Sequence, residues 1–98
     1  MPKPRILVVE DEQDVAKVIS INLELEDMEV TEAHDGPAAL ELIGSNAYDC
    51  VVLDVMLPRV SGWDILKSIK GNPETAGTPV VMVTARVKER DQLRGLGA

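Results

Sequence analysis

Four residues with oxygen-bearing side chains follow short apolar runs of the chain: Glu10, Asp11, Asp54 and Thr84. Carboxylate oxygens suit a hard cation, and Mg²⁺ is the natural choice for such ligands. A carboxylate beside bound Mg²⁺ can also attack phosphorus and form an aspartyl phosphate. A hydroxyl such as that of Thr84 could then donate a hydrogen bond to a phosphoryl oxygen. Metal binding and phosphoryl transfer are therefore the chemistry that these residue types favour.

These residues can meet only if the apolar runs are strands of one sheet. Runs of β-branched and aliphatic residues, as at 6–9, are typical of strands that are buried on both faces. Turn signals rich in glycine, proline and asparagine separate segments that have helical periodicity. We therefore expect strands at residues 5–10, 29–34, 49–54 and 79–84. We expect helices at about 11–26, after 35–37, after Ser61 and at 86–97.

Strands that alternate with helices predict an α/β fold, with a doubly wound parallel sheet covered on both faces. In such folds the working residues follow the carboxyl ends of the strands, where the strand order reverses. If the first and third strands are neighbours, Glu10, Asp11 and Asp54 converge at one end of the sheet. Close carboxylates strongly disfavour full ionisation without a counter-charge, so this arrangement favours a bound cation.

Length and composition limit the other possibilities. The 98 residues predict one domain, spanning 1–98, and a net charge of −7 argues against binding of nucleic acid through a basic face. The single cysteine excludes a disulfide framework within the chain and fits the cytoplasm. No apolar run is long enough to span a membrane. The charge is uneven, because residues 1–54 hold thirteen acids and three bases.

Three segments together resemble the receiver domain of two-component response regulators. They are residues 6–12, 54–64 and 79–85, and the resemblance extends from about residue 4 to the last residue. The middle segment is the most specific. In it, Asp54 is followed by a proline four residues on, a glycine eight residues on and an acid ten residues on. The resemblance implies a flavodoxin-like fold with strand order 2-1-3-4.

The resemblance also implies roles for individual residues around a Mg²⁺ ion. Asp54 is the implied phosphoacceptor, and its donor is a phosphohistidine on a sensor histidine kinase. Asp11 and Asp54 are implied to bind Mg²⁺ directly, with the backbone carbonyl of Met56, while Glu10 acts through water. The chain would then be a phosphoacceptor that assists its own phosphoryl transfer, not a turnover enzyme.

The phosphate-binding and switch residues implied by the resemblance are Thr84 and Ala85. Members of the family usually have a fifth strand that ends in a lysine, followed by a fifth helix, and neither is found here. Lys88 lies in the wrong place to supply that lysine. We therefore expect a C-terminally truncated receiver, with an output domain following it in the parent protein. The fourth strand would be an exposed apolar edge through which the chain could self-associate.

Several alternatives remain open from the sequence alone. Glu10 and Asp11 could simply cap a helix, and Thr84 could merely end a strand. A non-switching receiver-like module that binds a protein partner is the first alternative function. A flavodoxin-like binder of small molecules is weaker, because no glycine-rich phosphate loop follows the first strand. His34, the only histidine, is expected to be solvated and not catalytic.

Overall fold

The computed structural model describes residues 2–57 and 60–83. Within them, strands and helices alternate as β1 Arg5–Val9, α1 Gln13–Leu25, β2 Glu29–Ala33, α2 Gly36–Ser45, β3 Cys50–Asp54, α3 Gly62–Gly71 and β4 Val80–Val83. These elements agree with the expected order and lie within a few residues of the expected bounds. The helix expected at 86–97 lies outside the described residues, as do Thr84 and Ala85.

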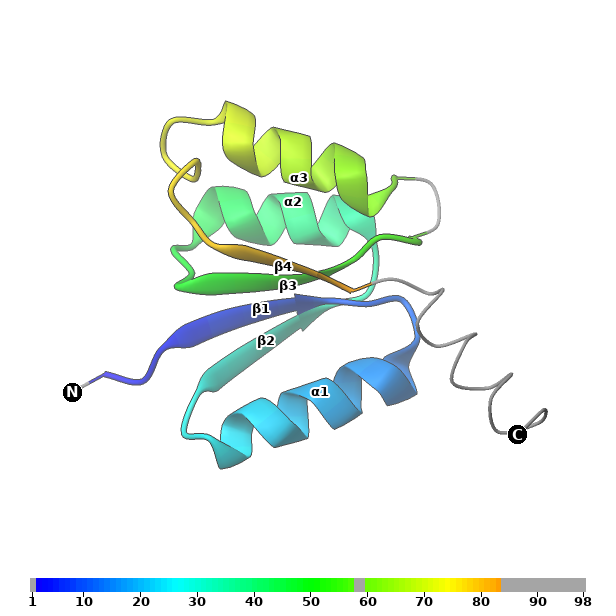
Figure 1. Cartoon of the computed structure of the whole chain (residues 1–98), viewed down its shortest axis with the longest axis vertical. Helices are drawn as coiled ribbons and strands as arrows, with labels where there is room; N and C mark the ends of the chain where they lie inside the picture. The colour runs from blue at the N-terminus through cyan, green and yellow to red at the C-terminus, as the bar shows by residue number, and fades with distance from the viewer. Residues whose placement is uncertain (1, 58–59, 84–98) are drawn as a thin grey trace.

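The four strands form one parallel sheet in the order β2-β1-β3-β4. Figure 1 shows α2 and α3 on one face of the sheet and α1 on the other. The prediction of a doubly wound sheet with this strand order is therefore confirmed. The polar sequence of β2 fits its place at an edge, whereas the apolar β1 and β3 occupy the centre.

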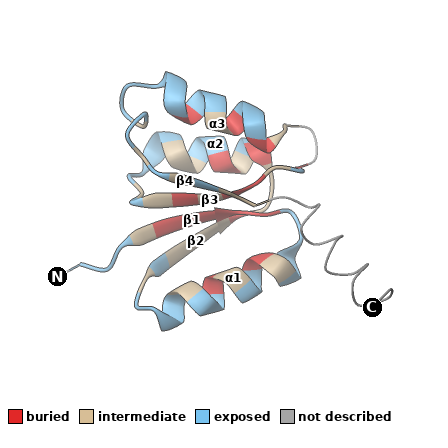
Figure 2. Ribbon diagram, viewed as in Figure 1, coloured by how far each residue is buried: buried red, intermediate tan, exposed pale blue. Residues whose placement is uncertain are grey.

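A hydrophobic core lies on each face of the sheet. On the α2–α3 side, Leu7, Leu53 and Ile65 are fully buried. On the α1 side, Val8 packs with Ala16 and both are fully buried. Figure 2 shows that the buried residues concentrate on the central strands and on the helix faces that meet them. Burial on both faces explains why β1 and β3 are continuous apolar runs and not alternating ones.

The helices of the described residues do not all begin in the same way. The Asp35 side chain accepts a hydrogen bond from the Ala38 N–H at 2.8 Å, and Ser61 accepts one from the Asp64 N–H at 3.2 Å. The N-cap of α1 is Glu12, which makes no side-chain cap bond. The alternative that Asp11 caps this helix is therefore wrong, and its side chain is available to the site.

No helix within residues 2–57 and 60–83 has the length and apolar character needed to cross a membrane.

Contacts between polar side chains join α1 to β2. Ser20, which is 4% exposed, donates a hydrogen bond to Oε2 of Glu32 at 2.8 Å. The Nε2 atom of His34 lies 3.0 Å from Oε1 of the same carboxylate. The His34 side chain is 39% exposed, which agrees with the expectation that it is solvated, and the contact to Glu32 adds to that expectation. Hydrogen bonds from His34 and Ser20 lower the pKa of Glu32 below its ordinary value.

The Glu32→Gln variant is expected to lose part of the stability of the protein at neutral pH. A lowered pKa in the folded state means that the charged carboxylate stabilises the fold above its ordinary pKa. That contribution is lost as the pH falls through the folded-state pKa. We expect a loss of about 1–2 kcal/mol at pH 7, which shrinks toward zero near pH 3. Urea unfolding at both pH values measures this difference.

The matched control is Glu41→Gln, which neutralises an exposed carboxylate on α2. We expect it to change the free energy of unfolding by less than about 0.5 kcal/mol at either pH. A Glu32→Gln variant whose loss of stability is the same at pH 3 and pH 7 would show that packing, not charge, is responsible.

Candidate functional site

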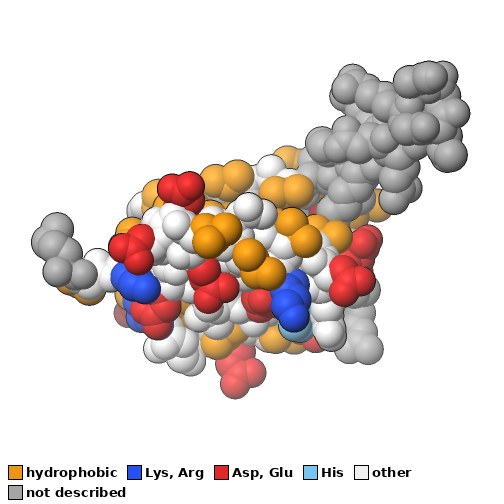
Figure 3. Space-filling model, turned by 90° about the horizontal axis from the view of Figure 1, so that it is seen from below, with side chains coloured by type: hydrophobic (Ala, Val, Ile, Leu, Met, Phe, Trp, Pro, Cys, Tyr) orange, Lys and Arg blue, Asp and Glu red, His pale blue; other side chains and the backbone are white. Residues whose placement is uncertain are grey.

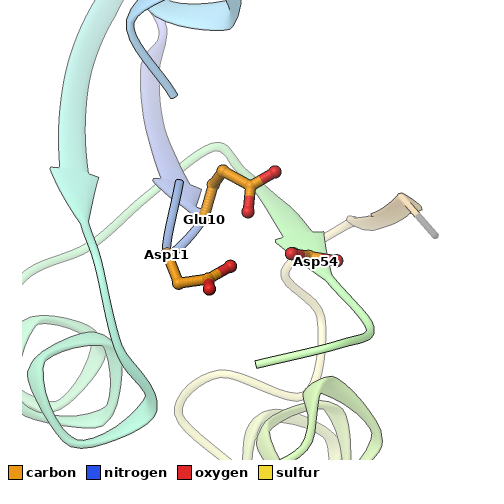
Figure 4. A group of neighbouring side chains, drawn as sticks. All are labelled: Glu10, Asp11 and Asp54. Carbon is orange, nitrogen blue, oxygen red and sulfur yellow. The ribbon is translucent and has the colours of Figure 1, made fainter. Parts of the chain in front are cut away.

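The site is built where β1 and β3 end side by side. Val9 pairs with Leu53 in the parallel register, so the residues that follow them, Glu10 and Asp54, lie next to each other. Figure 4 shows these two side chains and that of Asp11 gathered at this edge of the sheet. One carboxylate oxygen from each of the three lies within 4.8 Å of the others. The predicted convergence of Glu10, Asp11 and Asp54 is therefore found in the structure.

The three carboxylates differ in exposure. Glu10 is 1% exposed and Asp54 is 3% exposed, whereas Asp11 is exposed. Backbone N–H groups help to hold the two buried ones. The Met56 N–H donates to Oδ1 of Asp54 at 3.1 Å, and the Glu12 N–H donates to Oε2 of Glu10 at 3.4 Å. The site therefore has a buried floor and one side chain that faces solvent.

The loop that follows β3 returns against the strand at Gly62. The Gly62 N–H donates to the carbonyl oxygen of Val55 at 2.9 Å. A Cβ atom at position 62 would collide with the carbonyl oxygen of Asp54 and would lie 2.7 Å from the Cα of Val55. A glycine eight residues after Asp54 is thus required by a close approach of two backbones, which holds the start of α3 beside the site.

The carboxylate cluster has the composition of a site for a hard divalent cation. Its three donors are all oxygens, and such donors suit Mg²⁺ better than they suit softer metals. Carboxylates at this separation repel one another, and a bound cation would offset that repulsion. The residues present therefore fit a Mg²⁺ ion.

The other predicted site residues are not all placed by the structure. Met56 is described, and its backbone N–H is held by Asp54, while its side chain is 61% exposed. The role of its carbonyl as a metal ligand stays a prediction. Thr84 and Ala85 lie outside the described residues, so their phosphate-binding role also stays a prediction. Trp63, in the first turn of α3, is 56% exposed.

Residues 6–98 match the family model described as the response regulator receiver domain. The chain belongs to this family. Among curated relatives, the response regulator ArlR of Staphylococcus saprophyticus is 40% identical over 92 residues, which cover 94% of this chain and 40% of that protein. The sensory transduction protein RegX3 of Mycobacterium tuberculosis is 42% identical over 91 residues, covering 93% and 39% of the two chains. This receiver domain therefore spans about two fifths of the length of these relatives.

Solved receiver domains share the fold. The receiver domain of the Francisella response regulator 1452 has a TM-score of 0.79 at 33% identity, over 96% of this chain and 76% of that chain. The response regulator TrrA of Thermotoga maritima, in complex with Mg²⁺-BeF, has a TM-score of 0.80 at 30% identity, over 97% and 81% of the two chains. These likenesses confirm the flavodoxin-like receiver fold that the sequence predicts.

Proposed function

We propose that this receiver domain accepts a phosphoryl group on Asp54 in a Mg²⁺-dependent reaction, and that the donor is a phosphohistidine of a sensor histidine kinase. The observation that carries the proposal is the convergence of three carboxylate oxygens within 4.8 Å at the ends of β1 and β3. Asp54 is the acceptor because it is the carboxylate of the cluster that β3 supplies, and the specific 54–64 motif begins with it.

The residues of this cluster divide the work of holding the metal. Asp11 and Asp54 would bind Mg²⁺ directly, the carbonyl of Met56 would supply a further ligand, and Glu10 would act through water. When bound, Mg²⁺ neutralises the charge of the carboxylates and of the incoming phosphoryl oxygens. TrrA was solved in complex with Mg²⁺-BeF, and this supports the proposal that a receiver domain of this kind holds Mg²⁺.

The transfer step forms one bond and breaks one. A carboxylate oxygen of Asp54 forms the new O–P bond while the N–P bond of the phosphohistidine breaks. The histidine nitrogen keeps the electron pair of the broken bond and takes a proton from solvent. Each chain accepts one phosphoryl group, so the receiver is a phosphoacceptor that assists the transfer and not a turnover enzyme.

Phosphorylation would change the charge of an already acidic site. An acyl phosphate adds nearly two negative charges and three acceptor oxygens. We assign the response to this added charge to Thr84 and Ala85, which would bias the following segment toward an output domain or partner.

We propose that the reaction takes place in the cytoplasm. Relatives such as the transcriptional regulatory protein CpxR of Escherichia coli are longer, which supports an output domain in the parent protein.

The direct test uses acetyl phosphate as donor. The chain is incubated with acetyl phosphate and Mg²⁺, and its intact mass is measured. We expect the mass to rise by one phosphoryl group, and we expect hydroxylamine to remove it, as it does from an acyl phosphate. A chelator added before the donor should prevent the change. A chain that stays unmodified with Mg²⁺ present would contradict the proposal and would favour a non-switching interaction module.

Mg²⁺ alone is expected to stabilise the folded chain. A ligand that binds only the folded state at ten times its dissociation constant adds about 1.4 kcal/mol to the free energy of unfolding. The Asp11→Asn variant should lose most of this gain, because it removes one direct ligand. Thermal melts with and without Mg²⁺ measure the effect.

Asp14→Asn is the matched control, because Asp14 is an exposed acid in the first turn of α1 and lies outside the cluster. This variant should be stabilised by Mg²⁺ as much as the unmodified chain is. Equal responses from Asp11→Asn and the unmodified chain would remove Asp11 from the set of ligands.

A further inference from the structure

The segment that joins β3 to α3 carries one of the proposed metal ligands, the carbonyl of Met56. Backbone hydrogen bonds hold the base of this segment. The Val55 N–H donates to the carbonyl oxygen of Val83, and the Gly62 N–H donates to that of Val55, both at 2.9 Å. Leu57 is 9% exposed and packs in the core on the α2–α3 side. These contacts hold the part of the segment that is nearest to the sheet.

The part of the segment that returns toward α3 rests on the first residue of α2. Gly36 is buried, and a Cβ atom built on it would lie 2.6 Å from the Cβ of Val60 and 3.2 Å from both of its methyl carbons. The isopropyl group of Val60 therefore occupies the space that a side chain at position 36 would need. Figure 1 shows α2 and α3 beginning at the same end of the molecule, where β3 finishes.

Neither side of this contact can yield without a movement of backbone. The start of α2 is fixed, because the Asp35 side chain accepts the Ala38 N–H at 2.8 Å and Ala39 is fully buried. The crowded atom of Val60 is its Cβ, which is bonded directly to the backbone, so no change of rotamer moves it away. No described glycine has a positive φ, so alanine at position 36 lacks room and is not excluded by backbone strain.

We propose that Gly36 is a positioning residue for the Mg²⁺ site. Its missing side chain lets Val60 seat against α2, and this contact sets the path of the segment that carries the Met56 carbonyl. The inference rests on the proposed function, in which that carbonyl is a metal ligand beside the Asp54 carboxylate. Gly36 has no side chain to offer the ion, so it acts only through Val60. Replacing groups that orient metal ligands commonly lowers metal affinity by about ten- to a hundredfold.

Gly36 and Gly62 constrain different parts of the same segment. A Cβ at position 62 would meet the backbone of Asp54 and Val55, which are at the base of the segment. A Cβ at position 36 would meet only the returning part, with Val60 as its nearest neighbour. We therefore expect Gly36→Ala to weaken Mg²⁺ binding and still to leave Asp54 able to accept a phosphoryl group when Mg²⁺ is saturating.

Titration of the whole ¹⁵N-labelled chain with MgCl₂, followed by the amide shifts of residues 10–12 and 54–56, tests the proposal. We expect Gly36→Ala to raise the dissociation constant for Mg²⁺ by about tenfold. With acetyl phosphate and saturating Mg²⁺, its yield of phosphorylated chain should match that of the unmodified chain. Gly44→Ala is the matched control, because Gly44 lies in the same helix and a Cβ there meets nothing within 4 Å. It should leave the dissociation constant unchanged.

Diffuse attraction of Mg²⁺ to the acidic surface is the same in these variants. The chain has a net charge of −7, and Figure 3 shows acidic side chains spread over the face that carries α1. Exchange of glycine for alanine does not change this charge, and one ionic strength keeps the screening constant. A difference in dissociation constant between Gly36→Ala and Gly44→Ala therefore reports on the metal site itself.

Substitutions at Val60 separate positioning from a general loss of stability. In a Val60→Gly background the three atoms nearest to the added Cβ are absent. There, Gly36→Ala should change the dissociation constant by less than about twofold. Val60→Ala removes only the two methyl carbons that rest on Gly36, so it cannot crowd α2. It should raise the dissociation constant by about threefold, and this variant keeps the test valid if Gly36→Ala does not fold.

Hydrogen exchange of the Gly62 N–H gives a readout without metal, because this group closes the segment on Val55. Gly36→Ala should speed its exchange several-fold relative to Gly44→Ala. A dissociation constant that neither Gly36→Ala nor Val60→Ala changes would overturn the inference and leave the proposed function intact. Equal losses from Gly36→Ala in the two backgrounds would also overturn it. An unmodified chain whose amides do not respond to Mg²⁺ would overturn the inference and the proposed function together.

Discussion

Replacing Asp54 with asparagine is expected to abolish the gain of a phosphoryl group in the presence of acetyl phosphate and Mg²⁺. The amide oxygen of asparagine is a poor nucleophile, so no acyl phosphate can form at this position. The fold should survive, because asparagine is nearly isosteric and its Oδ1 can still accept the hydrogen bond that the Met56 N–H donates to Asp54. Intact-mass measurement after incubation gives the result directly.

The same variant has a second readout that does not depend on the donor. Without metal, Asp54→Asn removes one negative charge from a cluster of three carboxylates, so it should raise the free energy of unfolding by about 1 kcal/mol. Asp27→Asn is the control, because Asp27 is highly exposed and distant from the cluster. It should neither stabilise the chain nor prevent phosphorylation. A phosphoryl group that persists on the Asp54→Asn chain would show that another residue is the acceptor.

Replacing Gly62 with alanine is expected to produce the largest loss of stability among the substitutions considered, about 2–4 kcal/mol. The added Cβ would collide with the carbonyl oxygen of Asp54 and would lie 2.7 Å from the Cα of Val55. Both atoms belong to the backbone, so they can move only if the end of β3 moves. The variant should therefore also weaken the stabilisation by Mg²⁺, since Asp54 would be displaced. Urea unfolding with and without Mg²⁺ measures both effects.

Gly71→Ala is the matched control in the same helix. A Cβ at Gly71, the last residue of α3, meets nothing within 4 Å. This variant should be neutral or stabilised by up to about 1 kcal/mol, because alanine favours the helix. If Gly62→Ala were as stable as Gly71→Ala, the close approach at Gly62 would not constrain the fold.

The arrangement of the sheet and its carboxylates could be predicted because it follows from local patterns. Apolar runs at β1 and β3 predict central strands, and the carboxyl ends of neighbouring parallel strands share one edge. Glu10, Asp11 and Asp54 then meet without any knowledge of their exact distances. The order of the strands came from the resemblance to receiver domains, since periodicity alone does not choose between neighbours.

Other features could not be predicted because they depend on contacts between distant segments. Glu32 is bound by Ser20, twelve residues earlier, which no local pattern indicates. The contact between His34 and Glu32 was not predicted either, although the His34 side chain is partly exposed as expected. The structural need for Gly62 likewise appears only when the loop after β3 has folded back. The sequence showed the glycine and its spacing, but not the backbone that it must avoid.

Glu10 belongs to two parts of the molecule at once. Its carboxylate is one of the three that converge at the strand ends, and the same carboxylate accepts a hydrogen bond from the backbone N–H of Glu12, the N-cap of α1. A cation bound at the cluster would draw electron density from the Glu10 carboxylate and would weaken that hydrogen bond. The occupancy of the cluster and the anchoring of the α1 N-terminus are therefore thermodynamically linked, and each must influence the other by the same free energy.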